Sequence, residues 1–330
     1  MESLSEYVKH LYNEFGQRKP MGFAAERRDR PHFFLHRTFL GDQDLLVIFN
    51  SKRCRYQCNF CQLPAKSSRE LIPASDLVKQ FEYVVTELKH SLSIINRVTL
   101  ANEGSILDRD TFPEEALFTI LESIAEIRLV HRVVLESRLE FCDEAILNKA
   151  KVLNPRATLD LLTGFETVDE NIRDNILFKR QTLAQFTTGL DILAGVGAEL
   201  TCYILFKPDP AMTDFEAVEE AMRSFRFLKS ACESRNISLR IRLNPMYVAS
   251  GSKWEQMARK IPHYKSPRLT DVMRVAEEIR STGIPVYIGI SSEGLDIDGG
   301  TFHSREDFKS ELIRPIKLFN DGKIDRFTGR

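Results

Sequence analysis

The stretch Cys54-Arg55-Tyr56-Gln57-Cys58-Asn59-Phe60-Cys61 places three cysteines in one short loop with CxxxCxxC spacing. Three thiolates on so short a loop can hold three irons of a [4Fe–4S] cluster, because cysteine thiolates are the usual ligands of such clusters. The fourth iron would then lack a protein ligand, and an open coordination position distinguishes a catalytic metal site from a structural one. Phe60 stands just before the last cysteine, where its ring can pack against the adenine of a cofactor bound to that iron. The loop therefore predicts a catalytic iron–sulfur centre.

A zinc site, a disulfide framework and a redox pair each fit this cysteine loop less well than a cluster does. A structural zinc site needs four ligands, usually as two CxxC-type pairs, and the remaining cysteines, Cys142, Cys202 and Cys232, stand alone. A disulfide framework suits small secreted chains, whereas this chain has 330 residues. A redox motif built from Cys58 and Cys61 would leave Cys54 without a role. The cluster interpretation uses all three cysteines of the loop.

The composition is that of an ordinary folded protein. Hydrophobic residues make up 43% of the chain and charged residues 28%, which suits a full core and a soluble surface. No apolar run approaches the ~20 residues of a membrane-spanning helix, and the first residues lack the basic and apolar regions of an export signal. We therefore expect a cytoplasmic protein with no membrane partner. The formal net charge of -1 argues against a strong sequence-independent grip on nucleic acid but leaves room for a local basic patch.

Strand-like and helix-like segments alternate along the chain after residue 44. Leu45–Phe49 is an apolar run bounded by polar and glycine residues, as expected for a buried parallel strand. Further strand candidates are Arg97–Leu100, Val133–Glu136, Thr158–Leu162, Glu199–Phe206, Ile237–Leu243 and Val286–Ile290. Helical patterns cover about Ser75–His90, Asp143–Ala150, Leu183–Ala194, Phe215–Leu228 and Leu269–Ser281. Thr111-x-x-Glu114 and Thr213-x-x-Glu216 predict capping boxes at two helix starts.

This alternation predicts βαβ units and a parallel sheet. We therefore predict the α/β class and a partial (β/α)6-type TIM barrel, with a lead-in over residues 1–44, the barrel over 45–295 and a C-terminal extension over 296–330. The stretch Ala249–Pro267 is the best candidate for a long loop over a site. Within or beside it, Tyr247, Trp254 and His263 can stack on a base or pack the loop onto the barrel, and we expect packing.

Polar and glycine residues follow nearly every predicted strand. In a β/α barrel the chemistry sits where strands end and loops begin. Besides the cysteine loop, this rule selects Ala101-Asn102-Glu103-Gly104-Ser105, Glu136-Ser137-Arg138, Thr163-Gly164-Phe165-Glu166-Thr167, Phe206-Lys207-Pro208 and Asn244-Pro245-Met246-Tyr247. We expect all of these segments to meet the cysteine loop at one edge of the barrel.

Together with the cysteine loop, the order of these motifs resembles the radical S-adenosylmethionine (SAM) superfamily. The likeness is to the branch related to the Elongator catalytic subunit, and within it to the archaeosine-forming radical SAM lyases of archaea, which act on a modified guanosine of transfer RNA. It runs from about Leu45 to Glu293 and is specific in the loops. The resemblance implies an enzyme in which a reduced [4Fe–4S] cluster cleaves bound SAM, and the 5′-deoxyadenosyl radical abstracts hydrogen from the substrate. An electron donor such as flavodoxin or ferredoxin is implied as a partner.

The resemblance also implies roles for single residues. By position, Cys54, Cys58 and Cys61 would ligate the cluster and Phe60 would pack on the adenine. The segment Asn102, Glu103 and Gly104 stands where such proteins meet the SAM amino group, which suits a carboxylate or backbone carbonyls.

Four further residues receive roles in the same way. Arg138 would bind the SAM carboxylate, for which a guanidinium fork is well matched, and Glu136 would reach the ribose or the amine. Glu166 and Lys207 are the candidates for substrate contact and catalysis.

The sequence leaves the substrate and the reaction open. A transfer RNA base, a free nucleoside or nucleotide and a natural-product precursor are all compatible with these motifs. A sulfur-inserting enzyme is an alternative, and its second cluster would need ligands among Cys142, Cys202 and Cys232, which as isolated cysteines are more often buried small hydrophobes. A non-catalytic RNA-binding module that carries a cluster is a third interpretation, and it predicts no SAM cleavage.

Overall fold

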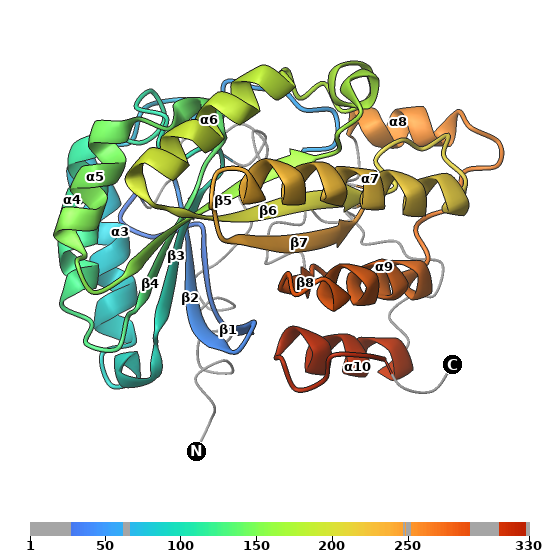
Figure 1. The fold of residues 1–330 in the computed structure, drawn as a ribbon. Coiled ribbons are helices and arrows are strands. Elements are labelled where there is room, and N and C mark those ends of the chain that lie inside the picture. Colours follow the sequence, from blue (N-terminus) through green and yellow to red (C-terminus); the bar gives the residue numbers. More distant parts are fainter. Residues whose placement is uncertain (1–27, 62–66, 247, 249–251, 291–309, 328–330) are drawn as a thin grey trace.

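The computed structural model describes residues 28–61, 67–246, 248, 252–290 and 310–327. Within them, one curled sheet takes its strands in chain order from β1 to β8 (Figure 1). The strands are β1 (Phe33–Phe39), β2 (Asp42–Phe49), β3 (Arg97–Asn102), β4 (Arg132–Glu136), β5 (Thr158–Glu166), β6 (Glu199–Phe206), β7 (Leu239–Pro245) and β8 (Val286–Ile288). Strands β2 to β8 are parallel to one another. The predicted α/β class and partial barrel are therefore confirmed.

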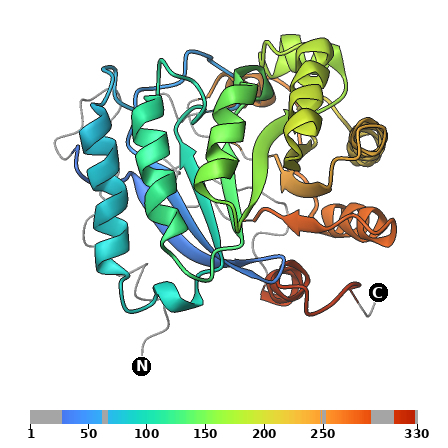
Figure 2. The same cartoon turned by 60° about the vertical axis from the view of Figure 1, so that its left-hand side comes forward.

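Helices cover the convex face of the sheet, apart from α8, which lies beyond the C-terminal ends of the strands (Figures 1 and 2). The helices are α3 (Ala74–Glu87), α4 (Glu114–Ala125), α5 (Glu144–Leu153), α6 (Leu183–Val196), α7 (Asp214–Glu233), α8 (Lys253–Arg259), α9 (Leu269–Ser281) and α10 (Ser310–Asn320). The main apolar core lies between this layer and the alternate strand residues that face it, such as Val98 and Leu100. None of the described helices combines the length and the apolar character that crossing a bilayer requires.

Two helix starts test the predicted capping boxes. Thr213 accepts from the backbone of Glu216 and the Glu216 side chain accepts from the backbone of Thr213, so this capping box is confirmed. The box at Thr111 is wrong, because α4 has Pro113 as its N-cap and no side-chain cap. The Thr111 hydroxyl instead donates to the carbonyl of Ser105, 3.2 Å away, in the preceding loop. Both the hydroxyl and the backbone N–H of Thr111 also donate to the carbonyl of Asp108, at 3.0 and 2.8 Å, so this side chain belongs to the turn and does not cap the helix.

Strand β1 lies inside the predicted lead-in and is not among the predicted strands. It pairs antiparallel with β2 across the turn Leu40-Gly41, whose φ angles of 53° and 95° match a type I′ hairpin. Its His36 and Arg37 are polar, yet both side chains are buried, on opposite faces of the strand, with Arg37 bound to Asp44 at 2.8 Å and His36 close to Gln43 at 2.9 Å.

The concave face carries charges near the N-terminal ends of the strands. Asp160 is fully buried there and accepts from Thr201 at 2.8 Å. Arg132 and Arg240 both bind Glu199, the latter at 2.6 Å. The stacked rings of Phe39 and Tyr287, 4.5 Å apart, bring the first and last strands together. Side chains thus close this end of the half-barrel, and the opposite end is the one available for a site.

Candidate functional site

The three cysteines lie in the loop that follows β2, at the C-terminal edge of the sheet. All three side chains are partly exposed. The backbone N–H of Tyr56 donates to the sulfur of Cys54 at 3.4 Å, the kind of bond that stabilises a thiolate. Burial raises the pKa of the Cys54 thiol, and this N–H works in the opposite direction. The donor set of three accessible thiols on one loop fits an iron–sulfur cluster.

In this conformation the thiols do not converge on one point. Across the part of the chain that the structure describes, no three His, Cys, Asp or Glu side chains are placed to hold a single metal ion. A [4Fe–4S] cluster binds each thiolate through a different iron, so it does not require the sulfurs to meet at one centre. The arrangement therefore supplies ligands for a cluster without forming a preassembled single-ion site.

The cysteine loop is held from both sides. On one side, Arg55 binds Asp108 through two bonds of 3.1 and 2.6 Å. On the other side, the N–H of Asn59 donates to the carbonyl of Leu177 at 2.8 Å. The carbonyl of Asn59 accepts from the N–H of Trp254 at 3.0 Å. Segments that follow β3, β5 and β7 therefore fix the loop, as expected for the working edge of a barrel.

Phe60 and Trp254 belong to a small apolar cluster under this loop. Phe60 packs at its margin, and its buried members are Ile172, Leu177, Leu205, Met246, Val248, Trp254 and Ala258. Trp254 is fully buried and donates its indole N–H to the carbonyl of Pro208 at 2.7 Å. Packing, the expected role, is therefore confirmed for Trp254, while His263 is exposed and Tyr247 lies outside the described residues. The predicted long loop contains helix α8.

The segment after β3 contacts the cysteine loop directly. A Cβ built on Gly104 would lie 3.4 Å from the Cα of Cys54, so the two backbones are in close contact. Asn102 turns its side-chain oxygen back onto the N–H of Gly104 at 3.0 Å and so shapes this approach. Glu103 is buried, with a carboxylate oxygen 3.5 Å from Nδ1 of His32. The predicted SAM-contact segment is therefore beside the cysteines, although its carboxylate points toward the start of β1.

Arg138 and Glu136 also lie at this edge. The Arg138 guanidinium stacks over the ring of Tyr56 with its Cζ 3.6 Å from the centroid. It donates to the carbonyls of Lys179 and Arg180 at 2.9 and 3.3 Å and pairs with Glu140. Glu136 accepts from the Tyr203 hydroxyl at 3.4 Å. Arg138 thus ties the cysteine loop to the segment after β5, and its predicted bond to the SAM carboxylate stays a prediction.

Glu166 and Lys207 share an unusual backbone. Both lie where their strands end and have left-handed φ angles of 70° and 67°, which non-glycine residues adopt mainly under constraint. The Glu166 carboxylate pairs with the ammonium of Lys179 at 3.2 Å, and Lys207 pairs with Asp214 at 3.0 Å. Strained residues of this kind cluster at functional sites.

Lys179 is a site residue that no sequence pattern indicated. It is 3% exposed although it lies in an irregular segment, shortly after the π-helical turn Ile172–Ile176. Its neighbours Phe178 and Arg180 have φ angles of 54° and 51°, so the chain turns sharply on both sides of it. No periodicity or motif marks such a segment, because its conformation depends on the arginines that bind it.

The isolated cysteines are core residues. Cys142, Cys202 and Cys232 are all buried in the main apolar core. Burial raises the pKa of Cys142 and of Cys232 to about 12 and that of Cys202 well above its ordinary value. Such thiols remain protonated at neutral pH and are poor metal ligands. Their placement gives no support to a second cluster.

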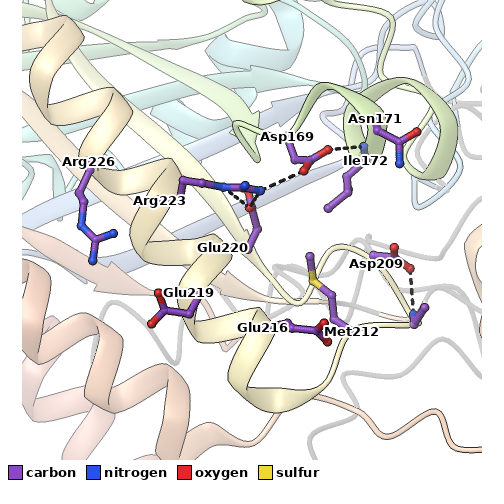
Figure 3. A pocket seen from close by; sticks show the side chains of 11 residues that line it. Asp169, Asn171, Ile172, Asp209, Met212, Glu216, Glu219, Glu220, Arg223 and Arg226 are labelled. Carbon is purple, nitrogen blue, oxygen red and sulfur yellow. Dashed lines mark hydrogen bonds and ion pairs between the residues drawn. The ribbon is translucent and has the colours of Figure 1, made fainter.

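A separate cavity of about 610 Å³ lies between the π-helical turn and helix α7 (Figure 3). Five of its eleven lining residues are acidic and two are arginines, of which Arg223 pairs with Asp169 at 2.9 Å and with Glu220. The lining residues are Asp169, Asn171, Ile172, Asp209, Ala211, Met212, Glu216, Glu219, Glu220, Arg223 and Arg226. None of the three loop cysteines lines this cavity. We therefore place the candidate functional site at the cysteine loop and not in this cavity.

Comparisons with known proteins agree with this assignment of the fold. The chain is similar to an uncharacterized protein of Methanocaldococcus jannaschii, with 26% identity over 301 residues that cover 89% of this chain and 78% of that protein. It is also similar to archaeosine synthase subunit beta of Thermococcus kodakarensis, with 27% identity over 201 residues and 59% of each chain. Both matches indicate distant homology. No protein-family model matches the chain.

Two solved structures share the half-barrel. Methylornithine synthase superposes with a TM-score of 0.50 over 96% of this chain and 89% of that chain, at 15% identity. A spore photoproduct lyase mutant with dinucleoside spore photoproduct gives a TM-score of 0.52 over 72% of this chain and 75% of that one, at 16% identity. The fold is therefore a partial TIM barrel of the radical SAM kind.

Proposed function

We propose that this protein is a radical SAM enzyme that modifies a guanosine-type nucleoside of transfer RNA. The observation that carries the proposal is the three-cysteine loop at the C-terminal edge of the half-barrel, beside the backbone of Gly104. The bound cluster would supply the electron that cleaves SAM and so starts hydrogen abstraction from the substrate. Cys54, Cys58 and Cys61 are the residues that would hold it.

The other residues of this edge would bind and orient. The ring of Phe60 offers an apolar margin for the adenine, and the segment Asn102–Gly104 offers polar backbone groups beside Cys54. Glu136 presents a carboxylate on the strand end of β4 for the ribose or the amine. Arg138 would contribute positive charge for the SAM carboxylate while it holds Tyr56 in place.

The Glu166–Lys179 pair would contact the substrate. A Cβ built on Gly164 would lie 2.1 Å from Oε1 of Glu166 and 3.1 Å from Nζ of Lys179, so both charges lie over this glycine. Gly164 pairs with Tyr203 across the sheet, and the Tyr203 hydroxyl reaches Glu136. The paired charges therefore stand close to the residues proposed for SAM.

The likeness to archaeosine synthase subunit beta supports transfer RNA over a free nucleoside as the substrate. Subunit beta of Methanosarcina acetivorans supports the same choice, with 22% identity over 84% of this chain. An enzyme that acts on one base of a folded RNA must bring that base out to its pocket. The open C-terminal edge of the half-barrel suits such an approach.

The proposal is tested by the iron and sulfide content of the anaerobically reconstituted protein. We expect about four irons per chain for the wild type and close to none for the Cys54/Cys58/Cys61→Ala variant. The control is Cys142→Ala, which should keep its iron because Cys142 belongs to the core. The wild type should also release 5′-deoxyadenosine from SAM after reduction with dithionite. Zinc in place of iron would rule out the radical mechanism, and iron retained in the triple variant would show a second cluster.

A further inference from the structure

Beside the cysteine loop, the surface carries an aromatic ring between two cations. Phe178 is partly exposed, while Arg180 and Lys253 are exposed. The guanidinium carbon of Arg180 lies 4.0 Å from the centroid of the Phe178 ring, and Nζ of Lys253 lies 5.8 Å from the same centroid. We call these three side chains the rim patch. Each of its members comes from a segment that follows the end of a strand.

The rim patch adjoins the proposed site through backbone bonds. Asn59, next to Cys58, donates its N–H to the carbonyl of Leu177 and accepts from the N–H of Trp254. Phe178 directly follows Leu177, and Lys253 directly precedes Trp254. Helix α8 and the segment after β5 therefore meet over Asn59. A partner that contacted the rim patch would lie at the entrance to the cysteine loop.

The segment that displays Phe178 and Arg180 is firmly held. Both residues have left-handed φ angles, 54° and 51°, between which Lys179 points inward and is buried. Arg138 binds the carbonyls of Lys179 and Arg180, and the fully buried Arg173 binds the next carbonyl, that of Gln181, at 2.9 Å. Strained backbone of this kind persists only where its surroundings hold it, and it is concentrated at functional sites.

The cations of the rim patch differ from two other arginines of the same region. Neither Arg180 nor Lys253 has an acidic partner among the described residues, whereas Arg259, on the same helix as Lys253, pairs with Glu255 at 2.6 Å. On the far side of the π-helical turn, Arg223 pairs with Asp169. Uncompensated cations around an exposed ring suit a chain of phosphates with bases that stack, because stacking is tolerant of sequence and charge attracts the backbone.

We propose that the rim patch binds a single-stranded segment of RNA at the entrance to the cysteine loop. Phe178 stacks on a base, and Arg180 and Lys253 contact the phosphates on either side of it. The inference rests on the proposed function for the identity of the substrate, but RNA binding at this surface does not require the cluster. The near-neutral protein as a whole, with a formal net charge of -1, leaves the local patch to provide the attraction.

The test measures binding of an unmodified transfer RNA transcript by fluorescence anisotropy over a range of salt concentrations. Arg180→Ala/Lys253→Ala should weaken binding by on the order of tenfold, and the slope of log K against log salt should become shallower by about 1.4, the value for two lost single-strand phosphate contacts. Phe178→Ala should weaken binding by roughly 5-fold or more, and Phe178→Trp should restore it, because a ring is what stacking needs.

A matched control is available on the helical layer. Nζ of Lys149 on α5 lies 3.8 Å from the centroid of the Phe118 ring on α4. Lys149→Ala/Phe118→Ala should leave RNA binding and its salt slope unchanged. The cysteine triple variant should also bind RNA like the wild type. Unchanged binding in the rim variants, or no RNA binding by the wild type, would overturn the inference. Failure of the wild type to cleave SAM, together with intact RNA binding by the wild type, would instead count against the proposed function alone.

Discussion

Strands β5 and β6 carry charged residues at both of their ends, and the two ends differ in kind. At the N-terminal end, Asp160 and Glu199 lie on regular strand backbone and face arginines of neighbouring strands. At the C-terminal end, Glu166 and Lys207 lie on left-handed backbone, at the edge of the sheet where the cysteine loop follows β2. Charge is common to both ends. Left-handed backbone and the edge that carries the cysteine loop belong only to the second.

At the N-terminal end, the pKa values of the two acids shift in opposite directions. Burial raises the pKa of Asp160. Burial also acts to raise the pKa of Glu199, but the bonds from Arg132 and Arg240 outweigh it and hold that pKa below its ordinary value. The N-terminal network is therefore a structural closure of the half-barrel. In barrels of this type the N-terminal end serves stability and the C-terminal end serves chemistry, and each prediction below tests that division.

The largest effect is expected from Gly164→Ala at the C-terminal end. The added methyl group would collide with Oε1 of Glu166 at 2.1 Å and displace the pair with Lys179. We expect substrate turnover to fall about a hundredfold, the scale of a misplacement near 1 Å. The measurement is the rate of product formation by the reconstituted enzyme. Gly195→Ala is the control, because a Cβ there meets no atom within 4 Å, and equal activity of the two variants would contradict the prediction.

Lys179→Met should lower kcat/KM about tenfold, which corresponds to roughly 1.4 kcal/mol of lost transition-state stabilisation. The reason is that Glu166, 6% exposed, loses the ammonium 3.2 Å away and is left as a buried carboxylate without its charged partner. Lys179→Arg should recover part of the activity, because it keeps the positive charge. The measurement is steady-state kinetics with the reconstituted enzyme. A variant with reduced stability but an unchanged kcat/KM would make Lys179 a structural residue only.

Glu199→Gln should lower the free energy of unfolding by about 2 kcal/mol at pH 7, the scale of lost bonds to charged partners. Because the folded pKa of Glu199 lies below its ordinary 4.5, its contribution is present above that pH and disappears as pH falls through the folded pKa. The difference between wild type and variant in urea unfolding should thus shrink below about pH 4.5. Turnover by the folded variant should match that of the wild type. A loss of turnover would contradict the assignment of stability to the N-terminal end and chemistry to the C-terminal end.

The smallest effect is expected at the hairpin turn. Leu40 has a φ of 53°, a conformation that asparagine tolerates better than leucine. Leu40→Asn should raise the free energy of unfolding by about 0.5 kcal/mol and the Tm by about 1–2 °C in a thermal scan. Activity should stay the same. A lower Tm would mean that the contacts of the leucine side chain outweigh the strain of its backbone.

Much of the barrel could be predicted from local patterns. The apolar runs of β2 to β8 are marked by composition and bounded by polar or glycine residues, so their order and parallel arrangement followed from the alternation with helices. Strand β1 escaped prediction because His36 and Arg37 are polar by composition. Their burial depends on partners such as Asp44, which Arg37 binds at 2.8 Å and which only the folded sheet supplies.

The candidate site divides in the same way. The spacing of the cysteines and the positions of Glu136, Arg138, Glu166 and Lys207 at strand ends were visible in the sequence, because strand ends are set by local apolar runs. The pairing of Glu166 with Lys179 was not visible, since it joins the strained end of β5 to the irregular segment that follows it. The orientation of Glu103 toward His32 was hidden for the same reason.

The sequence by itself determined the three thiols, their spacing and the βαβ order that places them at a strand end, because these depend on covalent neighbours and on short-range periodicity. Only the tertiary structure decided what surrounds them. The bonds from Arg138 to the segment after β5 and the closed N-terminal end join residues from separate strands and loops, and the ion pair over Gly164 joins the end of β5 to the irregular connection that follows it. Such contacts form only in the folded sheet, because folding brings those chain segments within bonding distance.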